Sequence, residues 1–183
     1  LQRKVDVVFS ESLTDALQRK TGGRADLVIG KRSVVEHDAV ESKLPLTPIA
    51  ALTGKDGSTT QTGLIVVPAG DPAKSAADLK GYRILFGPPE AQEKNAAAAQ
   101  LLKDHGVALP SPMETCEGCA EGAAIVLKGG ASARGAAVIS SYARPLLEGC
   151  GTVKKGDLRV VGETAPVPFI TAFAAKRLDP TLL

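Results

Sequence analysis

Two cysteines of the chain have a spacing that supports thiol chemistry. Cys116-Glu-Gly-Cys119 has the C-x-x-C spacing of a redox dithiol or of half a zinc site. No second C-x-x-C exists, no histidine directly follows Cys119, and His37 and His105 are distant in sequence, so a complete zinc site or haem attachment lacks support. We therefore expect a disulfide within the pair or to Cys150, with a redox or metal function as the alternative.

The signatures of several common enzyme classes are missing from the sequence. It contains no G-x-S-x-G, no H-E-x-x-H and no Walker loop. We therefore expect a protein that is not an enzyme, that needs no cofactor and that holds no resident metal, and we rank an enzyme with an unusual site last among the alternatives.

Polar side chains follow two of the predicted strands. Basic residues come directly after the apolar run 24–30, at Lys31 and Arg32, where a positive charge would suit an anion. Hydroxyl groups stand where the apolar run 136–140 meets a predicted helix, and they would bond a ligand or cap that helix: Ser140, Ser141 and Tyr142. Both groups are candidate ligand contacts, and an ordinary surface or capping role is the alternative for each.

Strands and helices are predicted to alternate along the chain. Short apolar runs predict strands at 4–10, 24–30, 59–68, 82–86, 136–140, 158–162 and 168–174. Helical periodicity and capping signals predict helices within 12–22, 75–79, 91–104, 120–128 and 142–148, and a loop or short helix within 34–48. This order favours an α/β fold with mainly parallel sheets, in which strands 4–10 and 24–30 would be parallel.

Size and composition limit the classes of function. The chain of 183 residues suits one large domain or two small lobes, and 44% hydrophobic with 23% charged residues is typical of a globular protein. A net charge of +2 gives no nucleic-acid surface, and 3% aromatic residues are too few for base-stacking platforms. No apolar run is long enough to span a membrane. We expect no nucleic-acid partner and no membrane-spanning segment.

One long phrase carries a resemblance to a known family. Residues 63–87, GLIVVPAGDPAKSAADLKGYRILFG, resemble the crossover region of type II periplasmic solute-binding proteins, in particular the phosphate-, phosphite- and phosphonate-binding (PhnD-like) family of ABC transporters. Other phrases agree in order: ADLVIG, PLTPIAALTGKDG, AAVISSYARPLL and VVGETAPVPFITAFAAKRLDPTLL. The resemblance covers nearly the whole chain, although the strand and helix that normally precede the KVDVVFS equivalent are missing.

The resemblance implies a two-lobed fold with two hinge crossovers. Lobe 1 would comprise 1–62 and 160–183, and lobe 2 would comprise 63–159. A small polar or anionic solute would bind between the lobes, at the carboxyl ends of strands. The protein would be a periplasmic or otherwise extracytoplasmic substrate-binding component that works with the membrane subunits of an ABC transporter. A signal segment is not present in this chain.

The resemblance also selects the residues that would contact the solute: Ser10, Lys31, Arg32, Thr62, Gln92, Lys94, Asn95, Ser140, Ser141 and Tyr142. The sequence departs from the family at 87–95, GPPEAQEKN, where a loop rich in Ser and Thr is usual. Two prolines there remove N–H donors, and two carboxylates would oppose an oxyanion. A neutral, zwitterionic or cationic solute, or a site without a small ligand, therefore stays open beside phosphate or phosphonate.

Overall fold

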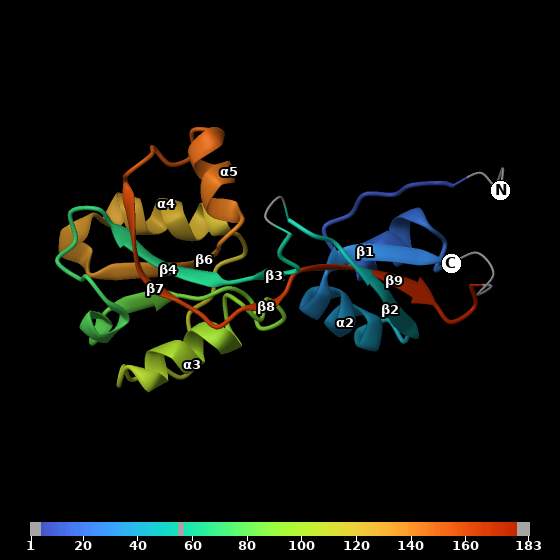
Figure 1. Cartoon of the computed structure of the whole chain (residues 1–183), viewed down its shortest axis with the longest axis horizontal. Helices are drawn as coiled ribbons and strands as arrows, with labels where there is room; N and C mark the ends of the chain where they lie inside the picture. The colour runs from blue at the N-terminus through green and yellow to red at the C-terminus, as the bar shows by residue number, and fades with distance from the viewer. Residues whose placement is uncertain (1–4, 55–56, 179–183) are drawn as a thin grey trace. The chain divides into compact units, whose positions relative to one another are not determined.

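The computed structural model describes residues 5–54 and 57–178, and it divides the chain into two compact units (Figure 1). Unit 1 comprises Leu1–Thr59 and Pro168–Leu183, and unit 2 comprises Thr60–Val167. The chain passes between the units twice, close to the short paired strands β3 (Thr60–Gln61) and β8 (Val167–Pro168). The sequence predicted the second crossing, from lobe 2 back to lobe 1, at residue 160. In the structure the strand at 158–163 still pairs within unit 2, so the chain crosses back only after Val167.

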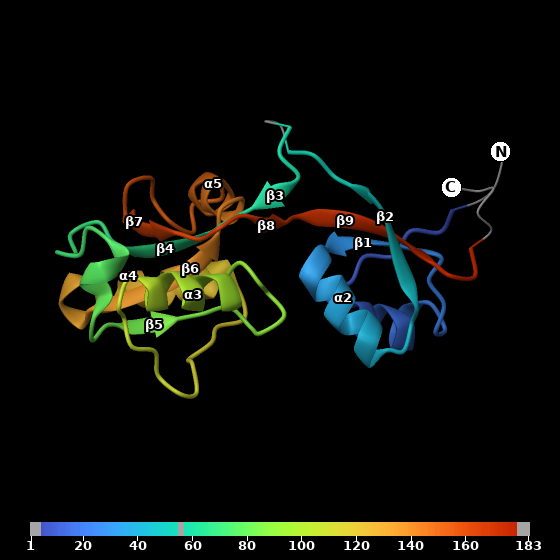
Figure 2. The same cartoon turned by 60° about the horizontal axis from the view of Figure 1, so that its bottom comes forward.

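Unit 1 contains a three-stranded sheet in the order β1-β9-β2. Its elements are α1 (Leu13–Asp15), a π-helical turn (Ala16–Lys20), β1 (Leu27–Lys31), α2 (Arg32–Glu41), β2 (Leu46–Ala51) and β9 (Ile170–Ala175). Helix α2 packs against β1, where an added Cβ on Gly30 would come within 2.8 Å of Val35 Cγ2 (Figure 2). The sequence predicted a loop or short helix within 34–48. The structure has the helix α2 and the strand β2 there, and the strand was not predicted.

The prediction of a first strand at 4–10 is wrong over residues 5–10, which are the part of it that the structure describes. Lys4 lies outside them, and residues 5–10 form neither a strand nor a helix. Val5, Val7 and Phe9 are 77%, 70% and 87% exposed. An apolar run becomes a strand only where a neighbouring strand supplies its hydrogen bonds, and the strand that pairs with β1 is β9.

Unit 2 contains a four-stranded sheet in the order β5-β6-β4-β7. Its elements beside β3 are β4 (Gly63–Pro68), a 3-10 helix (Ala76–Leu79), β5 (Arg83–Leu85), α3 (Ala96–Asp104), α4 (Cys119–Gly129), a 3-10 helix (Ala131–Ala133), β6 (Gly135–Ser140), α5 (Ala143–Gly149) and β7 (Leu158–Glu163). The helix cap predicted within 75–79 is present as a capping box, in which Ser75 and Asp78 bond each other's backbone N–H groups. The α/β class predicted from the sequence is therefore confirmed.

The prediction of mainly parallel sheets is wrong. β5 and β6 pair in parallel, but β4 pairs antiparallel with both β6 and β7. In unit 1, β9 pairs antiparallel with both β1 and β2. The reason lies in how the chain enters each sheet. β4 enters unit 2 at the edge where its neighbours β6 and β7 end, and β9 enters unit 1 at the edge where its neighbours β1 and β2 end. Each of these two strands therefore runs opposite to both of its neighbours.

Strand β4 shows where the core of unit 2 lies. All six of its residues are buried. Ile65 and Val67 pack with Leu102 of α3, whereas Leu64 and Val66 pack with residues of α4 and α5 on the other side of the sheet. Figure 1 shows α3 below this sheet and α4 and α5 above it. A strand that is covered on both faces has no polar face, which explains the uninterrupted apolar run GLIVVP.

Candidate functional site

One edge of the unit 2 sheet gathers most of the predicted binding residues. β5 and β6 are parallel and end there, and β4 begins there because Gly63 lies opposite Ser140. β7 ends there as well, with Glu163 opposite Leu64. We call this the polar edge of unit 2. It contains Thr62, the loop 87–95, Ser140–Tyr142 and Glu163–Thr164.

The loop 87–95 is held by its own backbone. The N–H of Ala91 donates to Pro88 O at 2.9 Å, and the N–H of Lys94 donates to Ala91 O at 2.9 Å. The ends of the loop are joined because Gly87 N–H donates to Lys94 O at 3.1 Å and the Asn95 side-chain amide donates to Gly87 O at 2.8 Å. The helix predicted from 91 therefore begins only at 96, because these turns occupy the preceding residues.

A buried carboxylate in the loop is bonded to the end of β6. Glu93 and Ser140 are both 0% exposed, and Ser140 Oγ donates to Glu93 Oε1 at 2.5 Å. The hydroxyl proton of Ser140 is therefore committed to Glu93. One of the two carboxylates that we expected to oppose an oxyanion is thus turned into the protein, and no sequence pattern indicated this.

Two further side chains of the loop are also buried. Lys94 is 5% exposed and Asn95 is 7% exposed. The Lys94 side chain lies against Gly87, where an added Cβ would come within 2.6 Å of Lys94 Cβ and Cε. The positive charge of Lys94 thus sits at the polar edge, in the loop that also carries the Glu93 carboxylate.

The loop touches β4 so closely that only glycine fits. A Cβ on Gly63 would lie 2.1 Å from the carbonyl oxygen of Glu93. Gly63 is fixed from the other side, because its N–H donates to Thr164 Oγ1 at 2.8 Å and its carbonyl accepts from Thr164 N–H at 2.9 Å. Sequence reasoning missed Gly63 as part of the site, since a glycine at the start of a strand carries no distinguishing signal.

Hydroxyl groups line the outer part of the polar edge. Ser141 N–H donates to Thr62 O at 2.9 Å, and Thr62 N–H donates to Ser141 Oγ at 3.2 Å. Thr62 Oγ1 donates to Glu163 Oε1 at 2.7 Å. Thr62 and Ser141 are half-buried, and Gln92 and Tyr142 are exposed, so all four side chains are accessible to solvent.

The other predicted residues belong to unit 1. Ser10 Oγ donates to Asp15 Oδ2 at 2.8 Å, and Arg32 Nε forms an ion pair with Glu36 Oε1 at 2.8 Å. Lys31 precedes α2 as its N-cap residue. The binding role of these three residues remains a prediction.

The cysteines are thiols in this structure, so the expected disulfide is absent from it. Cys116, Cys119 and Cys150 are all free. The Cys116 thiol is directed at the carbonyl oxygen of Phe86, 3.4 Å away, and Cys119 Sγ accepts the Ser140 N–H at 3.4 Å. Burial raises the pKa of the Cys116 thiol, and the positive charge of Lys94 opposes that rise. Because Cys116 contacts Phe86, directly before the loop 87–95, and Cys119 contacts Ser140, the two cysteines lie at the polar edge.

The described residues contain one cluster with three possible metal ligands, and it does not include the thiols. His37, Asp38 and Glu41 lie together on α2. Asp38 Oδ2 already accepts the N–H of Leu13 at 2.8 Å, and His37 Nε2 lies 3.4 Å from Glu41 Oε1. Asp38 thus anchors the turn at Leu13, and His37 and Glu41 form a pair one turn apart on α2.

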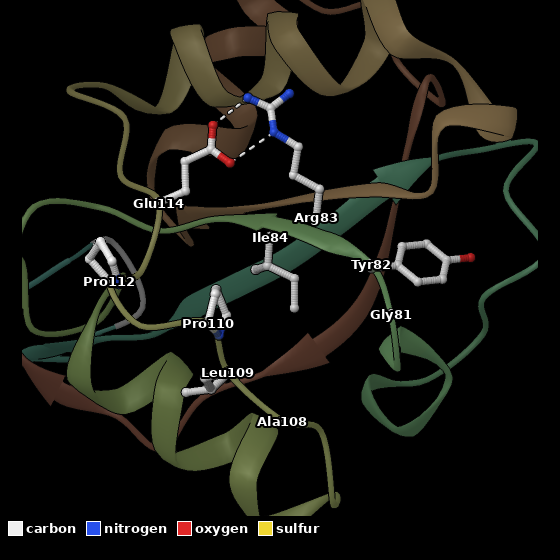
Figure 3. A pocket seen from close by; sticks show the side chains of 9 residues that line it. All are labelled: Gly81, Tyr82, Arg83, Ile84, Ala108, Leu109, Pro110, Pro112 and Glu114. Carbon is white, nitrogen blue, oxygen red and sulfur yellow. Dashed lines mark hydrogen bonds and ion pairs between the residues drawn. The ribbon is translucent and has the colours of Figure 1, made fainter.

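A separate hollow of about 580 Å³ lies along β5 (Figure 3). It is lined by apolar groups and by an ion pair in which Arg83 Nε donates to Glu114 Oε2 at 2.8 Å. The bond from Arg83 holds the pKa of the Glu114 carboxyl below its usual range. None of the predicted binding residues lines this hollow, so the hollow is not part of the polar edge.

None of the helices in the described parts of the chain has the length and apolar character needed to cross a membrane.

A sequence profile described as "ABC transporter, phosphonate, periplasmic substrate-binding protein" matches residues 1–183. Among curated protein sequences, none matches the chain.

Several solved structures share the fold. XAC2383 from Xanthomonas citri, solved with ATP, is 18% identical with a TM-score of 0.68, and the match covers 98% of this chain and 68% of that one. A binding protein component of an ABC phosphonate transporter from Pseudomonas aeruginosa (PA3383) is 15% identical with a TM-score of 0.66, with 86% and 53% covered. The periplasmic aliphatic sulphonate binding protein SsuA from Escherichia coli is 19% identical with a TM-score of 0.57, with 88% and 50% covered. The chain thus spans between half and about two thirds of the length of these proteins.

Proposed function

Because the chain belongs to the family of periplasmic phosphonate-binding proteins of ABC transporters, we propose that it captures a small polar solute outside the cytoplasm for delivery to transporter membrane subunits. The solute would carry a phosphonate- or sulfonate-type group. The observation that carries this proposal is the polar edge of unit 2, where accessible hydroxyls stand beside a rigid loop with a buried lysine.

The position of the polar edge supports binding. Ligands of α/β sheets commonly bind beyond the carboxyl ends of strands, and β5, β6 and β7 all end at this edge. Helix α3 follows the loop 87–95 and α4 begins at Cys119, whose sulfur contacts Ser140. Both helices therefore begin at the edge, where the N–H groups of a first turn favour a negative charge.

The chemistry of the accessible groups suits an oxyanion. Ser141 Oγ accepts a hydrogen bond from Thr62 N–H, so its own proton can be donated to a solute oxygen. Gln92 is exposed on the loop and offers amide donors. Glu93, by contrast, accepts the hydrogen bond of the Ser140 hydroxyl and is 0% exposed, which removes its carboxylate from the surface that the solute would meet.

Relatives in structure support the same class of solute. The P. aeruginosa protein is described as part of a phosphonate transporter and the E. coli protein as an aliphatic sulphonate binder. Both groups are tetrahedral oxyanions, so donors arranged for one also suit the other.

A thermal-unfolding screen tests the proposal. Stabilisation follows RT ln(1 + [L]/Kd), so a true solute at a hundred times its Kd raises the free energy of unfolding by about 2.7 kcal/mol. We expect methylphosphonate, phosphate or ethanesulfonate to stabilise the protein, and arginine or putrescine to have no effect. Stabilisation by the amines alone would overturn the oxyanion assignment, and no stabilisation by any of these compounds would refute solute capture.

Two variants then locate the site. Ser141→Ala should weaken binding roughly ten- to a hundredfold, since it removes one hydrogen bond to a charged group. Ser132→Ala is the matched control, because Ser132 is exposed on unit 2 in the short helix before β6. Equal affinities of the two variants would remove Ser141 from the site.

A further inference from the structure

We propose that Cys116 and Cys119 form a reversible dithiol–disulfide site, and that closing the disulfide weakens solute binding at the polar edge. The dithiol chemistry stands by itself, whereas its effect on binding rests on the proposed function. Nothing in the solute-capture role requires two thiols at this position.

Both sulfurs lie at the first turn of α4. Cys119 is the first residue of that helix. Cys116 Sγ lies over the same turn, because an added Cβ on Gly122 would come within 2.9 Å of it. Gly122 thus leaves room for this sulfur. A C-x-x-C pair that spans the start of a helix is the arrangement in which redox dithiols close a small loop.

The two thiols differ in access, which sets the order of the reaction. Cys116 is 7% exposed and Cys119 is half-buried. A disulfide oxidant such as oxidised glutathione therefore meets Cys119 first. The Cys119 thiolate attacks one sulfur of the oxidant, and the other sulfur leaves as a thiolate.

Cys116 completes the exchange. It loses its proton and attacks Cys119 Sγ in the mixed disulfide, which releases the second thiolate of the oxidant. The two cysteines together lose two electrons and the oxidant gains two. The raised pKa of the buried Cys116 thiol agrees with its role as the second, resolving thiol.

The dithiol is coupled to the polar edge through Ser140. Cys119 Sγ accepts Ser140 N–H at 3.4 Å and lies 3.8 Å from Ser140 Oγ, which in turn donates to Glu93 at 2.5 Å. A disulfide requires the two sulfurs to lie about 2.05 Å apart, whereas here Cys116 Sγ contacts Phe86 O and Cys119 Sγ contacts Ser140, so forming the bridge disturbs these contacts. Closing the bridge therefore loosens the contact that supports Ser140 and the loop 87–95.

A metal site fits the same residues less well. A structural zinc needs four ligands, and within the described ranges the cluster with three candidate ligands lies on α2, away from either thiol in sequence. Dithiol chemistry needs only the two sulfurs that the structure brings to one helical turn.

The experiment uses the protein with Cys150→Ser, which removes the exposed third thiol. The protein is equilibrated in buffers of reduced and oxidised glutathione, quenched and analysed by peptide mass spectrometry. We expect a bridge between residues 116 and 119, which reduced dithiothreitol reopens. Cys116→Ser should trap a glutathione adduct on Cys119, whereas Cys119→Ser should leave Cys116 largely unmodified. Failure to form the bridge, or binding of one zinc ion per chain, would overturn the dithiol site.

Two readouts test the coupling separately from solute binding. Hydrogen exchange in the loop 87–95 should be faster in the oxidised protein than in the reduced protein. The Kd of a solute found in the screen should rise roughly three- to tenfold on oxidation, as for the loss of one hydrogen bond. Unchanged exchange in a fully bridged protein would overturn the coupling. Faster exchange without any solute binding would support the coupling and refute the proposed function instead.

Discussion

The close contact between Gly63 and the loop 87–95 makes Gly63→Ala a severe test of the polar edge. The added Cβ would lie 2.1 Å from Glu93 O, 3.0 Å from Glu93 C and 3.1 Å from Thr164 Cγ2. Two of these three atoms are backbone, so no side-chain rotation relieves the overlap. The loop must retreat by roughly 1 Å or more to reach an ordinary van der Waals contact.

The structure indicates that this retreat costs about 3 kcal/mol, the upper end of the range for overpacking. Gly63 cannot move away, since it is hydrogen-bonded to Thr164 on both its N–H and its carbonyl group. Displacing the loop also strains the bonds that join Gly87 to Lys94 and Asn95. For a unit of this size the loss corresponds to a fall in Tm of roughly 12 °C or more.

The assay is thermal and urea unfolding of Gly63→Ala beside Gly70→Ala. Gly70 is the matched control, because an added Cβ there meets nothing within 4 Å. The control should change stability by no more than about 0.5 kcal/mol. If both variants unfold within about 1 °C of each other, the loop does not touch β4 as described and the geometry of the polar edge is refuted.

Two further predictions concern unit 2. Gly122→Ala should destabilise the protein, although alanine normally favours a helix by about 1 kcal/mol, because its Cβ would lie 2.9 Å from Cys116 Sγ. The same change should be stabilising in a Cys116→Ala background, and a double-mutant cycle by urea unfolding that gives no coupling would contradict this packing. Glu114→Gln should reduce stability by less than about 1 kcal/mol at pH 7, because the pair with Arg83 is partly exposed. Arg83 lowers the folded-state pKa of Glu114, so the contribution is present at neutral pH and is lost as the pH falls below the ordinary glutamate pKa and through the lowered folded-state pKa. A difference between wild type and Glu114→Gln that is the same at pH 7 and pH 3 would contradict it.

The sequence predicted those elements whose signals are local. The capping residues Ser75 and Asp78, the apolar β4 and the Ala-rich α4 are all present near their predicted positions. The α/β class follows from the alternation of such elements, and the family follows from phrases spread along the chain.

The sequence did not predict features that depend on distant partners. Residues 5–10 have the composition of a strand but form none, because hydrogen bonds to a neighbour, and not composition, complete a strand. The direction of β4 and β9 depends on how the chain enters each unit. The inward orientation of Glu93 depends on Ser140, a residue that lies 47 positions further along the chain.

The interior place of β9 in its sheet has a consequence for biosynthesis. β1 and β2 leave the ribosome early, but the strand that joins them follows only after all of unit 2. Pairings over such long separations form slowly, because a large chain segment must be closed into a loop first. During translation unit 2 can therefore complete its sheet while unit 1 still waits for its middle strand.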